Sequence, residues 1–155
     1  MGTTTALDWI IDFFDSRNIP YLICGGLAAI AYGSKRALND IDIYVPENKY
    51  QLVVDYGRDY ISYGPGRFKN EHWNVDYVQF IFRNQKIEVG NSSEVMIFDD
   101  IRQEWHQEEL DFDNYTSVVF SGKKVRLMTK VDLIAYKSKL NREVDKIDLA
   151  YIGKE

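Results

Sequence analysis

The sequence predicts an α/β protein, in the broad sense that includes α+β folds, with a mixed β-sheet flanked by helices. Two observations predict this class. Helical and strand patterns alternate in the first half of the chain, and the second half contains two strand pairs separated by turn residues. Helix crossovers allow parallel neighbours and hairpins give antiparallel ones, so one sheet should contain both kinds of pairing. A C-terminal helix pair, at about residues 129–152, completes the expected architecture.

Length and composition fit one globular domain spanning residues 1–155. The chain has 45% hydrophobic and 28% charged residues, which is ordinary for a protein with a buried core. Its net charge of −5 argues against the broad basic surface that nonspecific nucleic-acid binding requires. The single cysteine, Cys24, excludes an internal disulfide and a cysteine zinc site. The sequence has no apolar stretch of membrane-spanning length and no visible signal peptide, so a cytoplasmic location without a membrane partner is expected.

The N-terminal half is expected to contain three helices and two strands. The first helix has an apolar i, i+3, i+4, i+7 pattern, and Thr5 with Asp8 forms a capping box at its start. The second strand alternates apolar and polar residues, which predicts one buried face and one open face. The expected elements are helix 5–17, strand 21–24, helix 27–32, strand 40–45 and helix 46–57.

The C-terminal half is expected to contain two hairpins and the helix pair. Residues 83–85 and 121–122 are turn formers between apolar runs, and residues 64–66 (Gly-Pro-Gly) predict a further turn. Thr129 with Asp132 predicts a capped helix start. The expected elements are strands 75–82 and 86–89, a helix near 99–105, strands 117–120 and 124–128, and helices 129–140 and 143–152.

The main chemical signal is Asp40-Ile41-Asp42. Two carboxylates two residues apart on a strand share one face, close enough to bind the same divalent ion. Mg²⁺ is held by a few protein oxygens while substrate phosphates and water complete its octahedron, an arrangement that phosphoryl-type transfers use. The spacing alone also occurs on solvated edge strands, so its context decides the interpretation.

A glycine pair at a strand-to-helix junction supplies part of that context. Gly25-Gly26 precedes Asp40 in the sequence and follows an apolar strand. Glycines there let a backbone approach a phosphate, and a helix start offers free N–H groups. Arg36 adds a fixed positive charge between the two motifs. The ordinary alternatives are a tight turn and a solvated arginine.

Together these residues resemble the signature of the DNA polymerase β-like nucleotidyltransferase superfamily. The stretch from Tyr21 to Val45 is most similar to the minimal aminoglycoside and lincosamide nucleotidyltransferases and to the abortive-infection toxin nucleotidyltransferases. It departs from the usual pattern at Leu38-Asn39, where the family often has threonine. The matching residues are Gly25-Gly26-Leu27-Ala28, Tyr32-Gly33, Arg36 and Asp40-Ile41-Asp42-Ile43.

The resemblance implies a third carboxylate on a later strand. Glu88 is the preferred candidate, because it lies between apolar residues on a short predicted strand after a tight turn. Asp76, on the opposite arm of the same hairpin, is the competitor. The family often has aspartate at this position, where it acts as a base or as a metal ligand. Trp73 and Tyr77 flank this hairpin and are more typical of packing than of base stacking.

The C-terminal helices carry a weaker likeness to the abortive-infection branch, through Leu133-Ile134, Lys137, Arg142, Asp145 and Asp148-Leu149. In that branch the lysine lies near the nucleotide phosphates, which would make Lys137 a triphosphate ligand. The alternative of equal weight is a salt bridge from Lys137 to Asp145 or Asp148 within the helix pair. Asp148 is interpreted as a structural partner.

The expected reaction is transfer of a nucleoside monophosphate from a nucleoside triphosphate to a hydroxyl acceptor, with release of pyrophosphate. The resemblance implies that Asp40, Asp42 and Glu88 hold Mg²⁺ or Mn²⁺. Gly25 and Gly26, with Arg36 and Lys137, would bind the triphosphate. The acceptor class stays open between small molecule, RNA and protein, and a second copy in a homodimer is among the partners considered. The alternative hypothesis is a toxin-like or regulatory nucleotide-binding protein that acts with a macromolecular partner.

Overall fold

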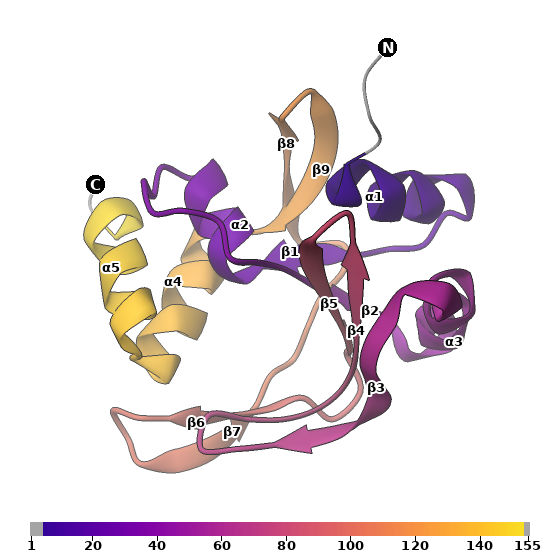
Figure 1. Ribbon diagram of the computed structural model, residues 1–155. Coiled ribbons are helices and arrows are strands. Elements are labelled where there is room, and N and C mark those ends of the chain that lie inside the picture. The colour runs from indigo at the N-terminus through magenta and orange to yellow at the C-terminus, as the bar shows by residue number, and fades with distance from the viewer. Residues whose placement is uncertain (1–4, 154–155) are drawn as a thin grey trace.

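The computed structural model describes residues 5–153 and has helices on both sides of one curved, mixed sheet. Figure 1 shows helices α1 and α3 on one side of the central strands, and α2, α4 and α5 on the other. The helices are α1 (Ala6–Ser16), α2 (Gly25–Ala31), α3 (Glu47–Tyr56), the short 3₁₀ helix η1 (Arg58–Tyr60), α4 (Lys130–Leu140) and α5 (Glu143–Ile152). None of the helices in this described part of the chain is long and apolar enough to cross a membrane.

The sheet has the strand order β7-β6-β4-β5-β2-β1-β9-β8, with β3 paired to β4. β2 runs parallel to β5 and β1 runs parallel to β9, while the remaining pairs are antiparallel, so the predicted mixed sheet is confirmed. The strands are β1 (Leu22–Cys24), β2 (Asp40–Val45), β3 (Ile61–Lys69), β4 (Trp73–Phe82), β5 (Gln85–Asn91), β6 (Met96–Asp99), β7 (Glu104–Gln107), β8 (Tyr115–Phe120) and β9 (Lys123–Met128).

Local sequence signals account for most of these elements. The Thr5–Asp8 capping box begins α1, and the Thr129 side chain accepts a hydrogen bond from the backbone of Asp132 at the start of α4. Both predicted hairpins form, and each has a turn of two residues with positive φ. Such turns match the right-handed twist of the flanking strands. The core lies between the sheet and the helices and includes Ile23, Ile43 and Ile87, each at most 2% exposed.

Two predicted elements were wrong. No helix forms near 99–105, because the Asp99 carboxylate accepts hydrogen bonds from the backbone N–H groups of Ile101 and Arg102, and Gln103 adopts a positive φ. The chain therefore turns back, and β7 pairs with β6. The Gly-Pro-Gly segment at 64–66 is not a chain reversal but an irregular part of β3, where the register against β4 shifts.

A third difference concerns α2, which begins at Gly25 and not after the glycine pair. Gly25 has φ +61, a left-handed conformation that favours glycine. The strand β1 therefore passes into α2 without an intervening loop, and the start of α2 lies directly beside β2.

Candidate active site

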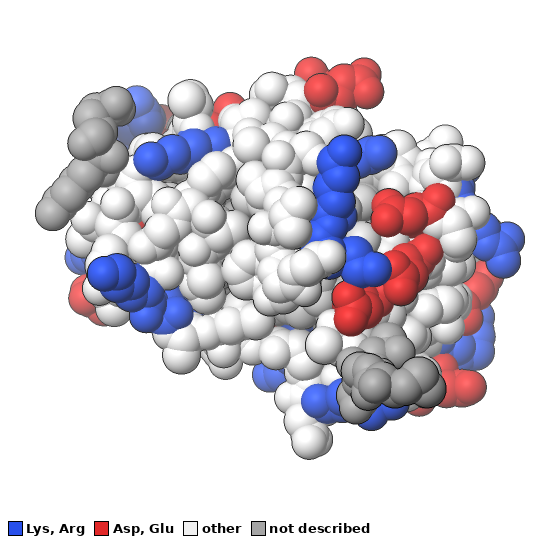
Figure 2. Space-filling model, turned by 90° about the horizontal axis from the view of Figure 1, so that it is seen from above, with Lys and Arg blue, Asp and Glu red and all other residues white. Residues whose placement is uncertain are grey.

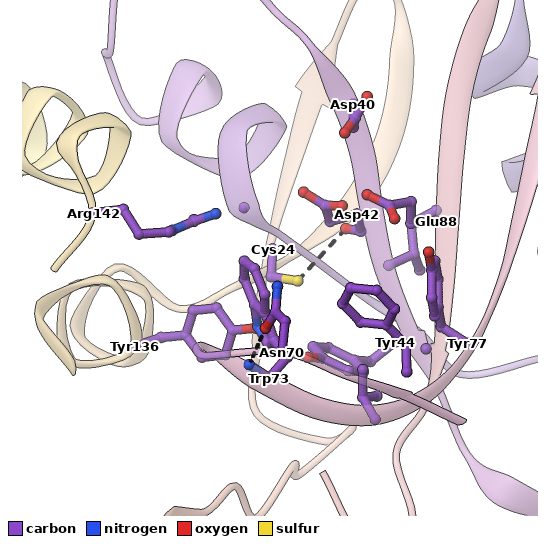
Figure 3. Close-up of a pocket in the computed structure, with 15 residues that line it drawn as sticks. Cys24, Asp40, Asp42, Tyr44, Asn70, Trp73, Tyr77, Glu88, Tyr136 and Arg142 are labelled. Atoms are coloured by element: carbon purple, nitrogen blue, oxygen red, sulfur yellow. Dashed lines mark hydrogen bonds between the residues drawn. The ribbon is translucent and has the colours of Figure 1, made fainter. Parts of the chain in front are cut away.

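The carboxylates Asp40, Asp42 and Glu88 come from two neighbouring parallel strands. β2 and β5 pair with Asp42 opposite Glu88, and Asp40 precedes Asp42 by two residues on the same face. All three line a cavity of about 310 Å³, into which Figure 3 shows their side chains projecting. As the predicted alternation of β2 requires, Tyr44 lines the same cavity as the two aspartates and Ile41 lies in the core, while Ile43 also borders the cavity.

Three acidic groups lie together in this site, which we call the carboxylate centre and define as Asp40, Asp42 and Glu88. Their proximity affects the pKa values of two of them. Burial and the neighbouring charge of Asp40 raise the pKa of Asp42 to about 6. Burial, followed by the charges of Asp42 and Asp40, raises the pKa of Glu88 to about 8. Asp42 and Glu88 each contribute to the pKa shift of the other, because their carboxyl groups lie close together in a half-buried site.

These residues fit a divalent cation by their chemistry. Carboxylate oxygens are the ligands that Mg²⁺ and Mn²⁺ prefer, and a bound cation would replace the proton that the Asp42–Glu88 pair retains. Within residues 5–153, no three His, Cys, Asp or Glu side chains, these three carboxylates included, lie close enough together to hold one metal ion among them. An ion at this centre would therefore complete its coordination with substrate or water oxygens, as Mg²⁺ commonly does.

Asp76, the competitor of Glu88, lies on the other face of β4. Its side chain is 41% exposed and lies 3.8 Å from the Arg67 guanidinium, whereas its chain neighbour Tyr77 lines the cavity. Because side chains alternate along a strand, Asp76 and Tyr77 cannot face the same space. The geometry therefore groups Glu88, not Asp76, with the two aspartates.

The two predicted glycines have different surroundings. Gly25 lines the cavity, and a Cβ at this position would overlap the Asp42 carboxylate. Gly26 is outside the cavity lining, and a Cβ there would overlap the Arg36 guanidinium. The pair therefore lets α2 pack closely against both an active-site carboxylate and an arginine.

Arg36 and Lys137 belong to a buried ion network behind the cavity. Arg36 Nε donates to Asp148 Oδ1 at 2.7 Å, and Lys137 Nζ lies 2.9 Å from Asp148 Oδ2 and 3.2 Å from Asp145 Oδ1. The Ser34 hydroxyl donates to Asp148 at 2.8 Å. The Lys137 side chain is 1% exposed, and neither Arg36 nor Lys137 lines the cavity. Lys137 therefore forms the salt bridges within the helix pair that the alternative interpretation of the sequence predicted.

The charges of this network are matched. Burial on its own would raise the pKa of Asp148, but the hydrogen bond from Arg36 and the nearby charge of Lys137 outweigh burial and lower it. The ion network, defined as Arg36, Lys137, Asp145 and Asp148, connects the loop after α2 with both C-terminal helices.

Arg142 is a cation that reaches the cavity, and no role was assigned to it from the sequence. Its Nε and Nη2 atoms donate to the two carboxylate oxygens of Asp145, at 2.7 and 3.0 Å. Its guanidinium lies 4.5 Å from the ring centroid of Trp73, within range of a cation–π interaction. Figure 3 shows Arg142 extending from the helix pair toward the carboxylate centre. Its position three residues before Asp145 is the only sequence signal for this bidentate pair.

The remaining cavity wall is largely aromatic. The hydroxyl groups of Tyr44 and Tyr136 lie 3.0 Å apart, and Trp73 Nε1 donates to Tyr136 at 3.1 Å. Burial and the charge of Glu88 raise the pKa of Tyr77 to about 12, which is consistent with its place beside the carboxylates. These rings join β2, β4 and α4 around the site, and the sequence did not assign them to it as a group.

Comparison with known proteins agrees with this geometry. The sequence profile of the Aminoglycoside-2''-adenylyltransferase family matches residues 6–152. No curated protein sequence gives a significant match. A Thermotoga maritima crystal structure, proposed to be a nucleotidyltransferase, is similar with a TM-score of 0.72 and 19% identity, over 93% of this chain and 87% of that one.

Two further structures are similar in fold. The lincosamide antibiotic adenylyltransferase LnuA, with lincomycin bound, has a TM-score of 0.62 and 14% identity, over 99% of both chains. ANT(2'')-Ia, in complex with adenylyl-2''-tobramycin, has a TM-score of 0.58 and 15% identity, over 95% of this chain and 87% of that one. Since the family profile spans nearly the whole chain and the carboxylate motif lies in its nucleotidyltransferase fold, the protein belongs to the Aminoglycoside-2''-adenylyltransferase family and is a nucleotidyltransferase.

Proposed function

We propose that the protein transfers a nucleoside monophosphate, AMP by analogy with its family, from a nucleoside triphosphate to a hydroxyl group of a small molecule. The observation that carries this proposal is the register of β2 and β5, which brings Asp42 and Glu88 together beside Asp40 in an open cavity. In the reaction, the acceptor oxygen forms a bond to the α-phosphorus, and the bond from that phosphorus to the bridging oxygen breaks. The hydroxyl proton leaves to a base, and pyrophosphate departs.

The carboxylate centre would perform two tasks. Asp40, Asp42 and Glu88 would anchor Mg²⁺ or Mn²⁺, which when bound neutralises charge on the phosphates and on the attacking oxygen. The pKa of Glu88 is higher than that of Asp42, which also suits Glu88 to receive the acceptor's proton. The sequence left the roles of ligand and base open for this residue, and both stay in the proposal.

Arg142 would stabilise the pyrophosphate that leaves. Its bidentate pair with Asp145 and its contact with Trp73 hold the guanidinium in one orientation at the cavity. A positioned cation beside a leaving phosphate stabilises the transition state because charge develops there. Gly25 would let the phosphates approach the start of α2. Arg36 and Lys137 were expected to bind the triphosphate directly. We assign them an indirect role in this binding, since their ion pairs hold the helices that carry Arg142. Gly26 would assist by making room for Arg36.

A small-molecule acceptor is favoured over RNA or another large anion. On the face seen in Figure 2, Lys and Arg side chains form small separate groups among uncharged residues, and acidic side chains lie beside several of them, so no continuous basic surface covers it. The cavity itself is hollowed between the sheet and the helix pair and is lined by side chains suited to a compact ligand.

The test is an incubation of the protein with Mg²⁺ and ATP labelled in the α-phosphate, against a collection of hydroxyl compounds. We expect transfer of the label to a small molecule, with release of pyrophosphate. Asp42→Asn should lower the rate by on the order of 10³-fold, because the ion would lose an anchor. Asp76→Asn is the matched control and should retain activity.

Two outcomes would refute the proposal. One is an Asp42→Asn variant that is folded and fully active. The other is a wild-type protein whose binding of ATP does not depend on Mg²⁺. Arg142→Gln should weaken the affinity for the triphosphate, and unchanged affinity would remove Arg142 from the site.

A further inference from the structure

We propose that Ser62 and Gln79 form a positioning relay that holds the Glu88 carboxylate in place for the divalent ion. The inference rests on the proposed function and adds two positioning residues behind the third carboxylate of the same site. The relay, defined as Ser62 and Gln79, begins at an exposed position on β3 and reaches Glu88 on β5 through β4.

Gln79 is the partner of Glu88 across two antiparallel strands. β4 and β5 pair with Gln79 directly opposite Glu88, and Tyr77, which lines the cavity, lies on the same face of β4 as Gln79. Gln79 Nε2 donates to Glu88 Oε2 at 3.3 Å. This bond restrains one oxygen of the carboxylate and leaves Oε1 available to an ion.

Ser62 determines which end of the Gln79 amide faces Glu88. The Ser62 hydroxyl lies 3.3 Å from the backbone oxygen of Gln79 and 2.9 Å from its Oε1, and it donates to the nearer oxygen. The Nε2 group is therefore turned toward Glu88. The reversed amide would place Oε1 against an ionised carboxylate, and two acceptors repel each other. Because a carboxylate that binds a cation must be ionised, the observed orientation suits ion binding.

A β-bulge in β3 brings Ser62 to this position. The register of β3 against β4 shifts between Ile61 and Tyr63, so Ser62 is an additional residue opposite Gln79. Both residues of such a bulge face the single residue on the partner strand. Accordingly, Ser62 contacts Gln79, while Tyr63 stacks on Tyr77 with ring centroids 5.2 Å apart. Bulges are common next to active sites, where they redirect a side chain.

The relay is neutral, which distinguishes it from the ion network. Asp145 and Asp148 meet Lys and Arg side chains within 3.2 Å, so their charges are already matched. A cationic side chain beside Glu88 would compete with a divalent ion for the same carboxylate. An amide donor instead restrains the carboxylate and leaves its negative charge to the ion. Partners of this kind behind metal-binding residues contribute about tenfold or more to metal affinity.

The test is a titration of the substrate-free protein with Mn²⁺, measured by the electron paramagnetic resonance signal of free Mn²⁺. Gln79→Met keeps the length of the side chain and removes the donor, so it should weaken Mn²⁺ binding about tenfold. Ser62→Ala should weaken it about threefold, because the amide can then reverse. Ser62 is exposed, so this variant should fold. Ser62→Thr keeps the hydroxyl and should bind Mn²⁺ as the wild type does.

The matched control is Gln51→Met. Gln51 Nε2 also donates to a carboxylate oxygen, Asp55 Oδ1, at 3.0 Å, but this pair lies on the exposed surface of α3. The control should therefore leave the affinity for Mn²⁺ unchanged. A loss equal to that of Gln79→Met would show that any glutamine-to-carboxylate bond has this effect, and it would overturn the proposal.

A double variant shows whether Gln79 acts through Glu88. In a Glu88→Gln background, Gln79→Met should cause no further loss of Mn²⁺ affinity, because the carboxylate that it positions has been removed. An equal loss in both backgrounds would overturn the proposal. Wild-type Mn²⁺ affinity in both Gln79→Met and Ser62→Ala would do the same.

A second measurement separates positioning from general damage to the fold. The affinity of Gln79→Met for a non-hydrolysable ATP analogue should be reduced at limiting Mg²⁺ and restored at saturating Mg²⁺, because the variant weakens only the hold on the ion. A loss of affinity that saturating Mg²⁺ does not restore would contradict the positioning role.

The same titrations separate this inference from the proposed function. A wild-type protein that binds no Mn²⁺ at millimolar concentration would refute the carboxylate centre as a cation site. Binding of Mn²⁺ that is lost in Asp42→Asn but unchanged in Gln79→Met would refute the relay alone.

Discussion

The carboxylate centre and the ion network are two groups of buried or half-buried charges with opposite properties. In the ion network each carboxylate meets a cation within 3.2 Å, and the pKa of Asp148 is lowered. In the carboxylate centre the negative charges meet each other, and the pKa values of Asp42 and Glu88 are raised. Removing one partner of a buried ion pair strongly destabilises a fold, whereas clustered carboxylates with raised pKa values are typical of a functional site.

The largest effect expected from this comparison is on Lys137. Lys137→Met should lower the free energy of unfolding by about 3 kcal/mol, because it removes one of the two cations that each of the buried carboxylates Asp145 and Asp148 contacts. Urea denaturation measures this loss. The control is Lys146→Met on the same helix pair, since Lys146 is 54% exposed and pairs only with Glu143. That variant should change stability by less than about 1 kcal/mol. Equal effects of the two variants would show that the ion network is not structural.

A smaller effect of opposite sign is expected at the carboxylate centre. Glu88→Gln should raise the free energy of unfolding of the metal-free protein by about 1–2 kcal/mol near neutral pH or above, because folding then forces Glu88 either to take up a proton or to place its charge beside Asp42 and Asp40, and Gln does neither. The same variant should lose nucleotidyl transfer. Asp76→Asn, on the opposite face of β4, should do neither. An active Glu88→Gln protein with an inactive Asp76→Asn protein would reverse the assignment of the third carboxylate.

The third prediction concerns pH. Asp42 and Glu88 have folded-state pKa values of about 6 and about 8, above their ordinary values of 3.8 and 4.5. The folded protein therefore binds more protons than the unfolded chain between about pH 4 and about pH 8, and its stability should fall as pH rises through this window. Melting temperatures in EDTA should show the fall, and Mg²⁺ should reduce it. A melting temperature that does not change with pH in EDTA would argue against close contact of the carboxylates.

Local sequence patterns were sufficient for much of the fold. The Thr5 capping box, the Thr129 cap, the two hairpin turns and the alternation of β2 each depend on residues close together in the chain, so their geometry follows from backbone stereochemistry. The helix predicted near 99–105, which does not form, shows where local sequence patterns are insufficient. There the side chain of Asp99 satisfies backbone N–H groups, and a strand partner is available from β6. Tertiary context of this kind overrides helix propensity.

In the candidate site, too, some features follow from local sequence and others from tertiary structure. The sequence by itself determined that Asp40 and Asp42 share a face, because a strand has a period of two residues. Only the tertiary structure decided that Glu88 lies opposite Asp42, that Lys137 lies between Asp145 and Asp148, and that Arg142 reaches the cavity. These three outcomes depend on strand pairing and helix packing between segments distant in sequence. The spacing of residues along the chain does not encode which distant segments meet, since burial of the whole core selects that arrangement.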